Sequence, residues 1–225
     1  MSKKDKKPRT KSGLREAFEL LAETAVFVFF ILTFVVQSFG VPTPSMEPAL
    51  LVGDFILVNK MAAAPAASAL ERALLPRREL RRGDIVAFKA PSEDLKKDYV
   101  KRVIALEGER LEIRGKQVLV DGLPLPEPYK VHLYGALPLE GDHFGPLTVP
   151  RGHVFVMGDN RDDSADGRTW GFLPAEYVKG FPWLIYFSYR AEPNSHLRTG
   201  LGERLKRFLS LLPKARWNRM FKVVR

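Results

Sequence analysis

One long apolar segment follows a run of basic residues near the start of the chain. It reads FELLAETAVFVFFILTFVVQSFGV from Phe18 to Val41, and its core Ala25–Val36 is apolar except for Thr33. About 20 apolar residues in a helix cross the hydrocarbon core of a bilayer. We therefore expect a single transmembrane helix over residues 18–41, with Glu19 and Glu23 on one face near its basic end, where they can reach the headgroups.

The chain carries its basic residues at its two ends. Residues 1–15 hold seven Lys or Arg against one acid, and residues 200–225 hold eight against one, so the net charge of +10 leaves the middle at −3. A basic flank keeps the N-terminus in the cytoplasm and sends residues 42 onward across the membrane. This distribution argues against a nucleic-acid-binding face and favours contacts between the ends and membrane headgroups.

A cleaved secretory signal is the alternative to an anchor. It too has a basic start and an apolar run, and Val36-Gln37-Ser38 resembles a small-residue cleavage site. We favour an uncleaved anchor because the apolar region is longer than the central apolar part of a usual signal. The chain has no cysteine, which excludes disulfides and thiolate chemistry.

Beyond the anchor the chain reads as short strands separated by turn residues. A hairpin is expected over Leu111–Val120, with its turn at Arg114-Gly115. Met61–Leu80, rich in Ala, is read as a mobile excursion rather than a short helix. The pattern predicts a mostly β body on a single helical stalk. The other β-branched or aromatic runs are Asp54–Asn59, Gly83–Lys89, Asp98–Ala105 and His153–Met157.

These features divide the chain into four parts. They are a basic cytoplasmic N-terminus (1–17), a transmembrane anchor (18–41), an extracytoplasmic β domain (42–198) with an inserted lobe around 109–150, and a basic amphipathic tail (199–225). In the tail, apolar residues follow helical spacing until Pro213, and they are Leu205, Phe208, Leu209 and Leu212. The tail is either an interfacial helix on anionic lipid or a solvated segment, and the sequence leaves both open.

A serine lies between prolines just after the apolar segment, in VPTPSMEPAL. Pro42 and Pro44 hold the backbone around Ser45 extended. The chain has no HExxH, GxSxG or GxxxxGK motif, and its four histidines show no paired metal-ligand spacing. The remaining nucleophilic scheme is a serine activated by a lysine.

A lysine that acts as a base must be neutral, so burial has to lower its pKa from about 10.4. Lys101 suits this role, because on a strand it shares a face with Tyr99 and Val103 while Arg102 points to the other face. Lys60 is the second candidate for the base. It begins the Ala-rich excursion, where it is expected to stay hydrated and to keep its charge. Spacing alone is weak evidence that Ser45 pairs with Lys101, since lysines on strands are usually solvated.

Four ordered blocks, together with the preceding anchor, resemble bacterial type I signal peptidases (leader peptidases), which are serine peptidases with a Ser-Lys dyad. The resemblance covers residues 18–174, and four blocks in order are far more specific than one motif. The blocks are Ser45–Leu50 (SMEPAL), Arg82–Phe88 (RGDIVAF), Tyr99–Ile104 (YVKRVI) and Gly158–Arg168 (GDNRDDSADGR).

The resemblance implies a role for each matched residue. Ser45 is expected to be the acyl-enzyme nucleophile and Lys101 the general base. Thr43 matches the hydroxyl that forms the oxyanion hole with the Ser45 backbone N–H, and Ser164 matches the serine that orients the lysine amine. The implied reaction removes signal peptides from translocated preproteins, after small residues at the first and third positions before the cleaved bond.

Further residues are expected around this dyad by the same resemblance. We expect Arg102 to pair with Asp159. The polar scaffold behind the dyad comprises Arg102, Asp159, Arg161, Asp166 and Arg168. The residues expected to line the substrate pocket are Val41, Pro42, Met46, Leu50, Tyr99 and Val100, with core packing as the alternative for the apolar ones.

No metal or cofactor is expected. The run Asp162-x-Ser164-x-Asp166-Gly167 opens like an EF-hand loop, but its twelfth position is Leu173 instead of Glu. The sequence also departs from the family pattern at Pro44, at Ala105–Gly108 and at Gly167. None of these departures removes a reacting group, although the shape of the substrate groove can differ.

The expected location is the bacterial cytoplasmic (inner) membrane, crossed once. Expected partners are preproteins with signal peptides and membrane phospholipid, with the secretion translocase as a further candidate and no nucleic acid. Three other readings stay open: a soluble self-cleaving repressor with a related fold, a tethered β domain that only binds translocated chains, and a peptidase dedicated to one substrate.

Overall fold

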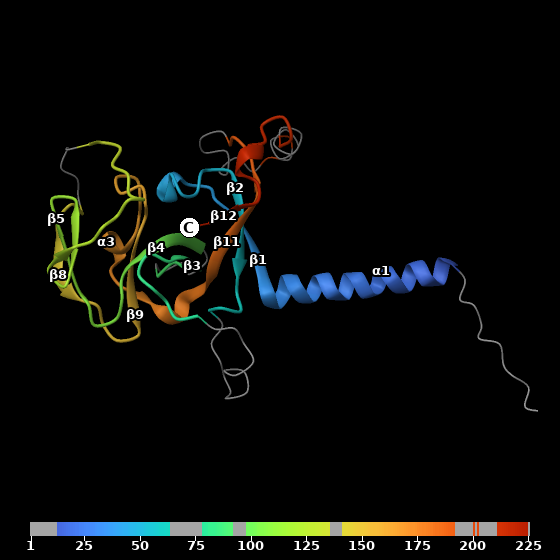
Figure 1. The fold of residues 1–225 in the computed structure, drawn as a ribbon, viewed down its shortest axis with the longest axis horizontal. Coiled ribbons are helices and arrows are strands. Elements are labelled where there is room, and N and C mark those ends of the chain that lie inside the picture. The colour runs from blue at the N-terminus through green and yellow to red at the C-terminus, as the bar shows by residue number, and fades with distance from the viewer. Residues whose placement is uncertain are drawn as a thin grey trace, which may run out of the picture.

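A long helix, α1 (Gly13–Phe30), projects from one end of a β-rich body (Figure 1). The computed structural model describes residues 13–63, 78–91, 98–135, 141–191, 200, 202 and 211–224. A short π-helix, η1 (Ile31–Val35), continues α1, and the 23 residues Gly13–Val35 are long and apolar enough to cross a membrane. None of the residues in α1 is buried against the body.

The helical segment begins and ends earlier than the expected span of residues 18–41. Val36–Gly40 forms a strand, β1, which pairs antiparallel with β2 (Asp54–Asn59) from Val36 opposite Asn59 to Gly40 opposite Phe55. The helix stops because pairing with β2 gives this stretch hydrogen-bond partners that a helix would otherwise supply. The chain therefore passes directly from the apolar helix into the main sheet.

The main sheet is curled and has eight strands, in the order β1-β2-β11-β3-β4-β9-β10, with β12 added to β11. All of its strand pairs are antiparallel. The remaining strands are β3 (Ile85–Lys89), β4 (Asp98–Ala105), β9 (His153–Met157), β10 (Leu173–Pro174), β11 (Val178–Ser188) and β12 (Lys222–Val223).

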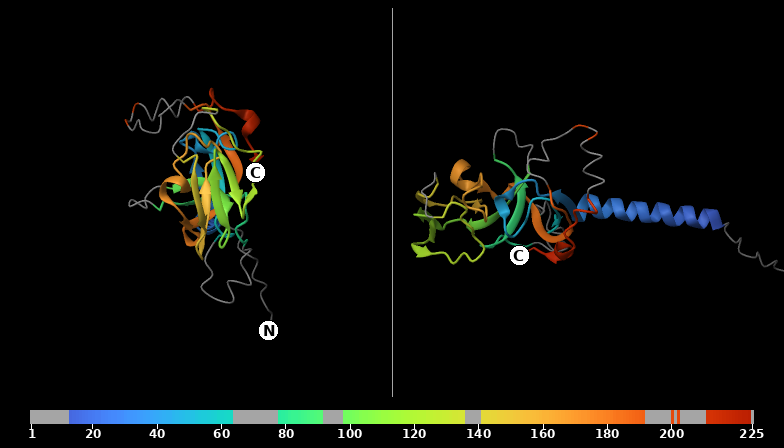
Figure 2. Two further views of the ribbon diagram at one scale, coloured as in Figure 1. Left: turned by 90° about the vertical axis from the view of Figure 1, so that its left-hand side faces the viewer. Right: turned by 90° about the horizontal axis from the view of Figure 1, so that it is seen from above.

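A smaller four-stranded sheet forms the end of the body far from α1 (Figures 1 and 2). Its order is β7-β6-β5-β8, and the β5–β6 hairpin turns at Gly115 and Lys116, which both have positive φ. The expected hairpin is confirmed, with its turn one residue later. The strands are β5 (Arg110–Arg114), β6 (Gln117–Val120), β7 (Leu123–Pro124) and β8 (Phe144–Thr148).

The predicted mostly β body on one apolar helix is confirmed. Strands 54–59, 98–105 and 153–157 form over the expected residues, whereas β3 starts two residues after Gly83, which lies in a turn with φ 90. Short helices complete the fold: η2 (Pro44–Met46), α3 (Gly167–Trp170), η3 (Ala175–Tyr177) and η5 (Trp217–Arg219).

Two expected segments are only partly described. Residues 64–77 of the excursion Met61–Leu80 lie outside the described residues, as do Leu205, Phe208 and Leu209 of the tail. Leu212 lies in a turn. The end of the chain then returns to the body and adds β12 to β11, with Val223 opposite Leu184.

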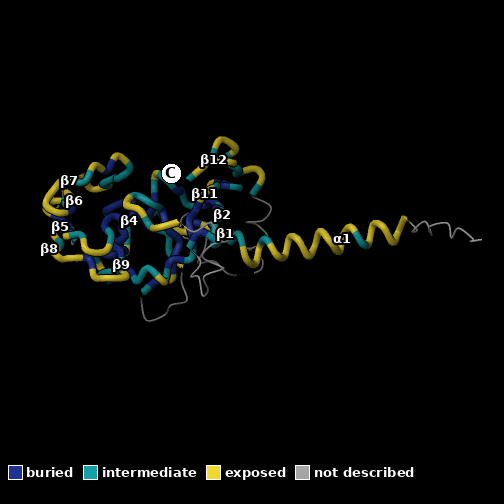
Figure 3. Tube along the Cα trace, turned by 60° about the horizontal axis from the view of Figure 1, so that its bottom comes forward, coloured by how far each residue is buried: buried dark blue, intermediate teal, exposed yellow. Residues whose placement is uncertain are grey.

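The buried segments, dark blue in Figure 3, lie inside the β body. Their apolar side chains form three clusters. One of them joins Met46 and Leu50, which flank the serine turn, to Ile56 of β2, Ile85 of β3 and Ile185 of β11. The serine turn therefore rests on the main sheet and is not a free loop.

Candidate active site

Ser45 lies on the short helix η2, and two features of the local sequence hold it there. Thr43 is extended and Pro44 occupies the first helical position, which suits the fixed φ of proline. Asn160 binds the turn from the opposite side, because its N–H donates to Ser45 O at 3.2 Å and its Nδ2 to Pro44 O at 3.3 Å. Asn160 belongs to the matched block Gly158–Arg168, but the sequence assigned it no role of its own. Its contact with the serine turn is seen only in the structure.

Lys101 lies on β4 directly across from Ser45. Its Nζ donates to Ser45 Oγ at 2.5 Å, and the two residues are only 3% and 8% exposed. Burial lowers the pKa of Lys101 to about 8, although the carboxylate of Asp166 opposes the shift. A lysine that loses its proton near pH 8 beside a serine hydroxyl can act as a general base. Lys60, the second choice, instead donates to Thr33 O at 2.6 Å.

Arg102 turns to the other face of β4 and makes the expected pair with Asp159. Its Nε and Nη2 donate to the two oxygens of Asp159 at 2.8 and 2.7 Å, and its Nη1 donates to Gly83 O at 2.8 Å. The guanidinium also lies 4.1 Å from the centre of the Tyr129 ring. Both partners are buried, so the pair fixes β4 against the loop that follows β9.

Two more arginines hold that loop in shape. Arg168 donates from Nε and Nη2 to the two oxygens of Asp166, each at 2.9 Å, and from Nη2 to Arg161 O at 2.6 Å. Burial disfavours the charge of Asp166, but Arg168 and the N–H of Gly158 hold its pKa below the usual value. Arg161 binds Glu127, a buried acid that the sequence offered no signal for, because it lies in the inserted lobe.

Gly158 is where the loop meets the serine turn. A Cβ atom at Gly158 would lie 2.3 Å from Ser164 Oγ and 2.4 Å from Ser45 O, so only glycine fits. Ser164 Oγ is buried and forms no hydrogen bond of ordinary geometry among the described residues, although it lies near Asp166 and helps to hold the pKa of that carboxyl below its usual value. Ser164 therefore lies beside the serine turn without a hydrogen bond to Lys101.

Thr43 is exposed at the rim of the site. Its Oγ1 is 3.4 Å from Ser45 Oγ, close enough for a weak hydrogen bond. No hydrogen bond from the N–H of Ser45 occurs among the described backbone contacts outside helices and strands. A hydroxyl and an N–H thus lie next to Ser45 Oγ.

The residues expected to line the pocket divide into two groups. Val41, Met46 and Leu50 are buried in an apolar cluster, so for them the structure supports the core-packing alternative. Pro42 is exposed. Tyr99 and Val100 are half-buried and pack against two different apolar clusters, with the Tyr99 ring 5.8 Å from Lys101 Nζ.

Asp162, the first residue of the EF-hand-like run, is bound by other groups of the protein. Asp162 accepts a hydrogen bond from Tyr134 N at 2.8 Å and lies 2.9 Å from His132 Nδ1 and 3.5 Å from Lys116 Nζ. These contacts use its oxygens within the protein. No cluster of three or more potential metal-binding side chains occurs among the described residues.

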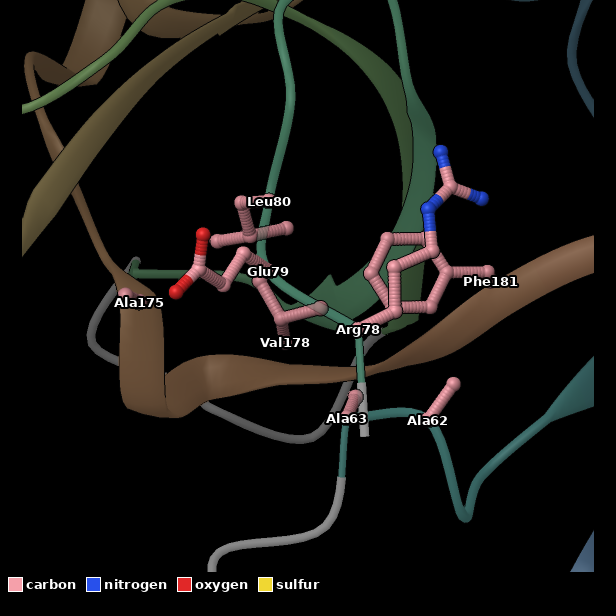
Figure 4. Close-up of a pocket in the computed structure, with 8 residues that line it drawn as sticks. All are labelled: Ala62, Ala63, Arg78, Glu79, Leu80, Ala175, Val178 and Phe181. Carbon is pink, nitrogen blue, oxygen red and sulfur yellow. The ribbon is translucent and has the colours of Figure 1, made fainter. Parts of the chain in front are cut away.

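The body also has a cavity of about 420 Å³ (Figure 4). Two of the residues that line this cavity are Arg78 and Phe181, and the guanidinium of Arg78 lies 4.9 Å from the centre of the Phe181 ring. None of the residues that line the cavity belongs to the site around Ser45. They are Ala62, Ala63, Arg78, Glu79, Leu80, Ala175, Val178 and Phe181.

Comparison with known proteins identifies the family. The family model described as "Signal peptidase, peptidase S26" matches residues 14–187. The chain belongs to the signal peptidase I family. The predicted family is therefore confirmed, and with it the assignment as a peptidase. Signal peptidases cleave signal peptides from preproteins, and the apolar N-terminal helix is consistent with anchoring in a membrane.

Two signal peptidases are similar to this chain over most of its length. Signal peptidase I of Pseudomonas aeruginosa is 32% identical over 207 residues, which cover 76% of this chain and 72% of the relative. Signal peptidase I P of Bacillus subtilis subsp. natto is also 32% identical, covering 81% of this chain and 94% of the relative. A solved signal peptidase I from Enterococcus faecalis V583 is 31% identical, with a TM-score of 0.39, covering 46% of this chain and 97% of that structure.

Proposed function

We propose that this signal peptidase cleaves preproteins with Ser45 as the nucleophile and Lys101 as the general base. The observation that carries the proposal is the buried hydrogen bond from Lys101 Nζ to Ser45 Oγ at 2.5 Å. A serine hydroxyl is a weak nucleophile at its own pKa and needs an adjacent base to take its proton. The lowered pKa of Lys101, about 8, supports that role.

The reaction proceeds in two halves. Ser45 Oγ attacks the carbonyl carbon of the scissile bond while its proton moves to Lys101 Nζ. The resulting ammonium then gives this proton to the departing amine, and the mature protein leaves. The signal peptide stays as an ester on Ser45 until water, deprotonated by Lys101, attacks that ester. The ester C–O bond then breaks, Lys101 returns the proton to Ser45 Oγ, and the signal peptide leaves with a free carboxyl group.

Thr43 and the N–H of Ser45 stabilise the negative oxygen of each tetrahedral intermediate in this proposal. The proximity of Thr43 Oγ1 to Ser45 Oγ, 3.4 Å, supports the role. Ser164, buried beside Gly158, orients the lysine amine once substrate is bound. The pairs Arg102–Asp159, Arg161–Glu127 and Arg168–Asp166 keep the surrounding loop in place.

The protein works at the outer face of the cytoplasmic membrane, with its N-terminus in the cytoplasm. The support is the basic N-terminal flank and the short distance along the chain between Val35, where the helix ends, and Ser45. A serine so near the end of the anchor meets the end of a signal peptide's apolar helix at a similar depth. Cleavage follows small residues at the first and third positions before the cut.

Cleavage of a detergent-solubilised preprotein with an Ala-x-Ala junction tests the proposal. We expect Ser45→Ala and Lys101→Ala each to lower cleavage by about 10⁴-fold or more. Lys89→Ala, which removes an exposed lysine at the end of β3, serves as the control and keeps full activity. Unchanged cleavage by Ser45→Ala or Lys101→Ala would refute the dyad.

The same assay separates the remaining alternatives. The assignment to a peptidase family already argues against a tethered domain that only binds translocated chains. A peptidase dedicated to one substrate would cleave one junction among a panel of preproteins, whereas a general processor would cleave most of them.

A further inference from the structure

Asn160, in the loop that follows β9, binds two successive carbonyl groups of the serine turn. Its backbone N–H donates to Ser45 O at 3.2 Å, and its side-chain Nδ2 donates to Pro44 O at 3.3 Å. The residue is 2% exposed, and 116 positions separate it from Pro44 in the sequence. These two hydrogen bonds therefore join the peptide groups on both sides of the Cα atom of Ser45 to a distant loop.

The peptide group between Pro44 and Ser45 is the one that bears on the reaction. It carries Pro44 O and the Ser45 N–H, and this N–H is one of the two oxyanion donors in the proposed function. The peptide is trans and planar, so its C=O and N–H point in opposite directions and turn together. A hydrogen bond that fixes the direction of Pro44 O thus also fixes the direction of the Ser45 N–H.

The same hydrogen bond strengthens this donor. A hydrogen bond to an amide oxygen draws electron density toward the oxygen and leaves the N–H of that amide more positive. Within a protein such bonds strengthen one another by about 10–30% per bond. Both the direction and the strength of the proposed oxyanion donor therefore depend on Nδ2 of Asn160.

The amide of Asn160 fits the turn in only one orientation. If it were turned over, its Oδ1 would face Pro44 O, and two acceptors repel each other. In the observed orientation Oδ1 is buried and has no hydrogen-bond partner within the described part of the chain. An unpaired buried amide oxygen costs free energy, so an amide is a poor choice for merely filling this space. What the amide supplies, and an apolar side chain of similar shape would not, is the donor to Pro44 O.

The backbone is held on both sides of Asn160. Asp159 pairs with the buried Arg102, and Arg161 pairs with a buried acid of the inserted lobe. A parallel bridge opposite Val131 adds two hydrogen bonds, from Val131 N to Asp159 O at 2.8 Å and from Arg161 N to Val131 O at 3.0 Å. The position of Asn160 is therefore set before substrate arrives, as a group that positions reacting atoms requires.

We propose that Asn160 is a positioning residue, which holds the Pro44–Ser45 peptide so that the Ser45 N–H points at the oxygen that becomes negative during cleavage. The proposal rests on the proposed function, in which Ser45 is the nucleophile. Asn160 acts through the peptide group and not by contact with the reacting atoms. Because the negative oxygen develops only after Ser45 attacks, loss of the Nδ2 donor should lower kcat and leave KM little changed.

Two variants of the full chain in detergent test this role. Asn160→Leu has a similar shape without the donor, and Asn160→Asp replaces Nδ2 with an oxygen, while both keep the backbone N–H that binds Ser45 O. Asn59→Leu is the matched control, because the Asn59 amide accepts from Ala62 N at 3.4 Å and takes no part in the site around Ser45. Denaturant unfolding shows whether each variant is folded. The kinetics use the Ala-x-Ala preprotein, and kcat is taken from the plateau of the pH profile, so that a change in the protonation of Lys101 does not enter the comparison.

Two peptide inhibitors add a readout that a loss of stability would not change. The first ends in Ala-x-Ala with an aldehyde in place of its carboxyl group. Ser45 Oγ forms a bond to the aldehyde carbon, the C=O double bond becomes single, and the serine proton passes through Lys101 to the former aldehyde oxygen, which lies where the oxyanion would lie. The second inhibitor is the corresponding alcohol, which binds without forming this bond.

In both Asn160 variants we expect kcat to fall by about 10–100-fold with KM changed by less than about 2-fold. The inhibition constant of the aldehyde should rise by a similar factor while that of the alcohol stays the same, and Asn59→Leu should change none of these values. If only one Asn160 variant folds, that variant decides.

Full kcat in a folded Asn160 variant, or equal weakening of the aldehyde and the alcohol, would overturn the positioning role. Failure of both variants to fold would assign Asn160 a structural role and overturn it too. Ser45→Ala separates these results from a failure of the proposed function: an aldehyde that binds Ser45→Ala as tightly as the unaltered protein would refute Ser45 as the nucleophile.

Discussion

The amine of Lys101 donates a hydrogen bond to Ser45 Oγ at 2.5 Å, although 56 residues separate them in the sequence. The lysine comes from the middle of a buried strand and the serine from a short helix at the end of β1. Because the amine is almost entirely buried, its charge is disfavoured, and the pH of the solution decides whether it can accept a proton.

The first prediction concerns pH. Since the base must be neutral and the pKa of Lys101 is about 8, kcat/KM should rise with pH and level off above about 9. At pH 7 about a tenth of the enzyme should be in the neutral form. Cleavage rates between pH 6 and 10 on a substrate without titratable groups near the junction check this. A profile that is flat from pH 6 to 8 would contradict the assignment of Lys101.

The second prediction concerns Thr43. Thr43→Val removes a hydroxyl and keeps the shape of the side chain, so kcat should fall by about 10²-fold with little change in KM. Thr43→Ser keeps the hydroxyl and should stay within a few-fold of the unaltered protein. Steady-state kinetics of the two variants provide the comparison, and an equal loss in both would assign Thr43 a packing role instead.

The third prediction concerns the buried pair Arg102–Asp159. Asp159→Asn leaves the buried guanidinium without its counter-charge, which should lower the free energy of unfolding by about 3–5 kcal/mol. Glu112→Gln removes the charge that pairs with the exposed Arg114 and should lower the free energy of unfolding far less. Denaturant unfolding in detergent measures both. Similar losses in the two variants would mean that the Arg102–Asp159 pair adds little.

The fourth prediction concerns Gly158. A methyl group at this position collides with Ser164 Oγ and with the backbone oxygen of Ser45. Gly158→Ala should therefore shift the serine turn and lower kcat by about 10²-fold or more, since small displacements of reacting groups are costly. Gly200→Ala, at a position with open space, is the control and should keep full activity. Normal kinetics in Gly158→Ala would show that the turn can move without loss.

The sequence by itself determined the features that depend on neighbouring residues. The apolar run predicted the helix, and runs of β-branched or aromatic residues bounded by turn residues predicted β2, β4 and β9 at their observed bounds. The prolines around Ser45 predicted an extended backbone, which is confirmed at Thr43 but wrong for Pro44–Met46, because proline at the first helical position allows a turn of 3₁₀ helix there. These features follow from local periodicity and backbone restrictions, which are set by residues close together in the sequence.

Only the tertiary structure decided which groups are buried together. Lys60 follows β2 and Lys101 lies on β4, yet only Lys101 lies beside Ser45, because β4 packs against the serine turn. The end of the helix at Val35 depends on pairing with β2, and the returning C-terminal end depends on the buried charge of Asp54. The burial of a charge and its pairing involve residues far apart in the chain, so these outcomes are set by the folded packing and leave no local pattern in the sequence.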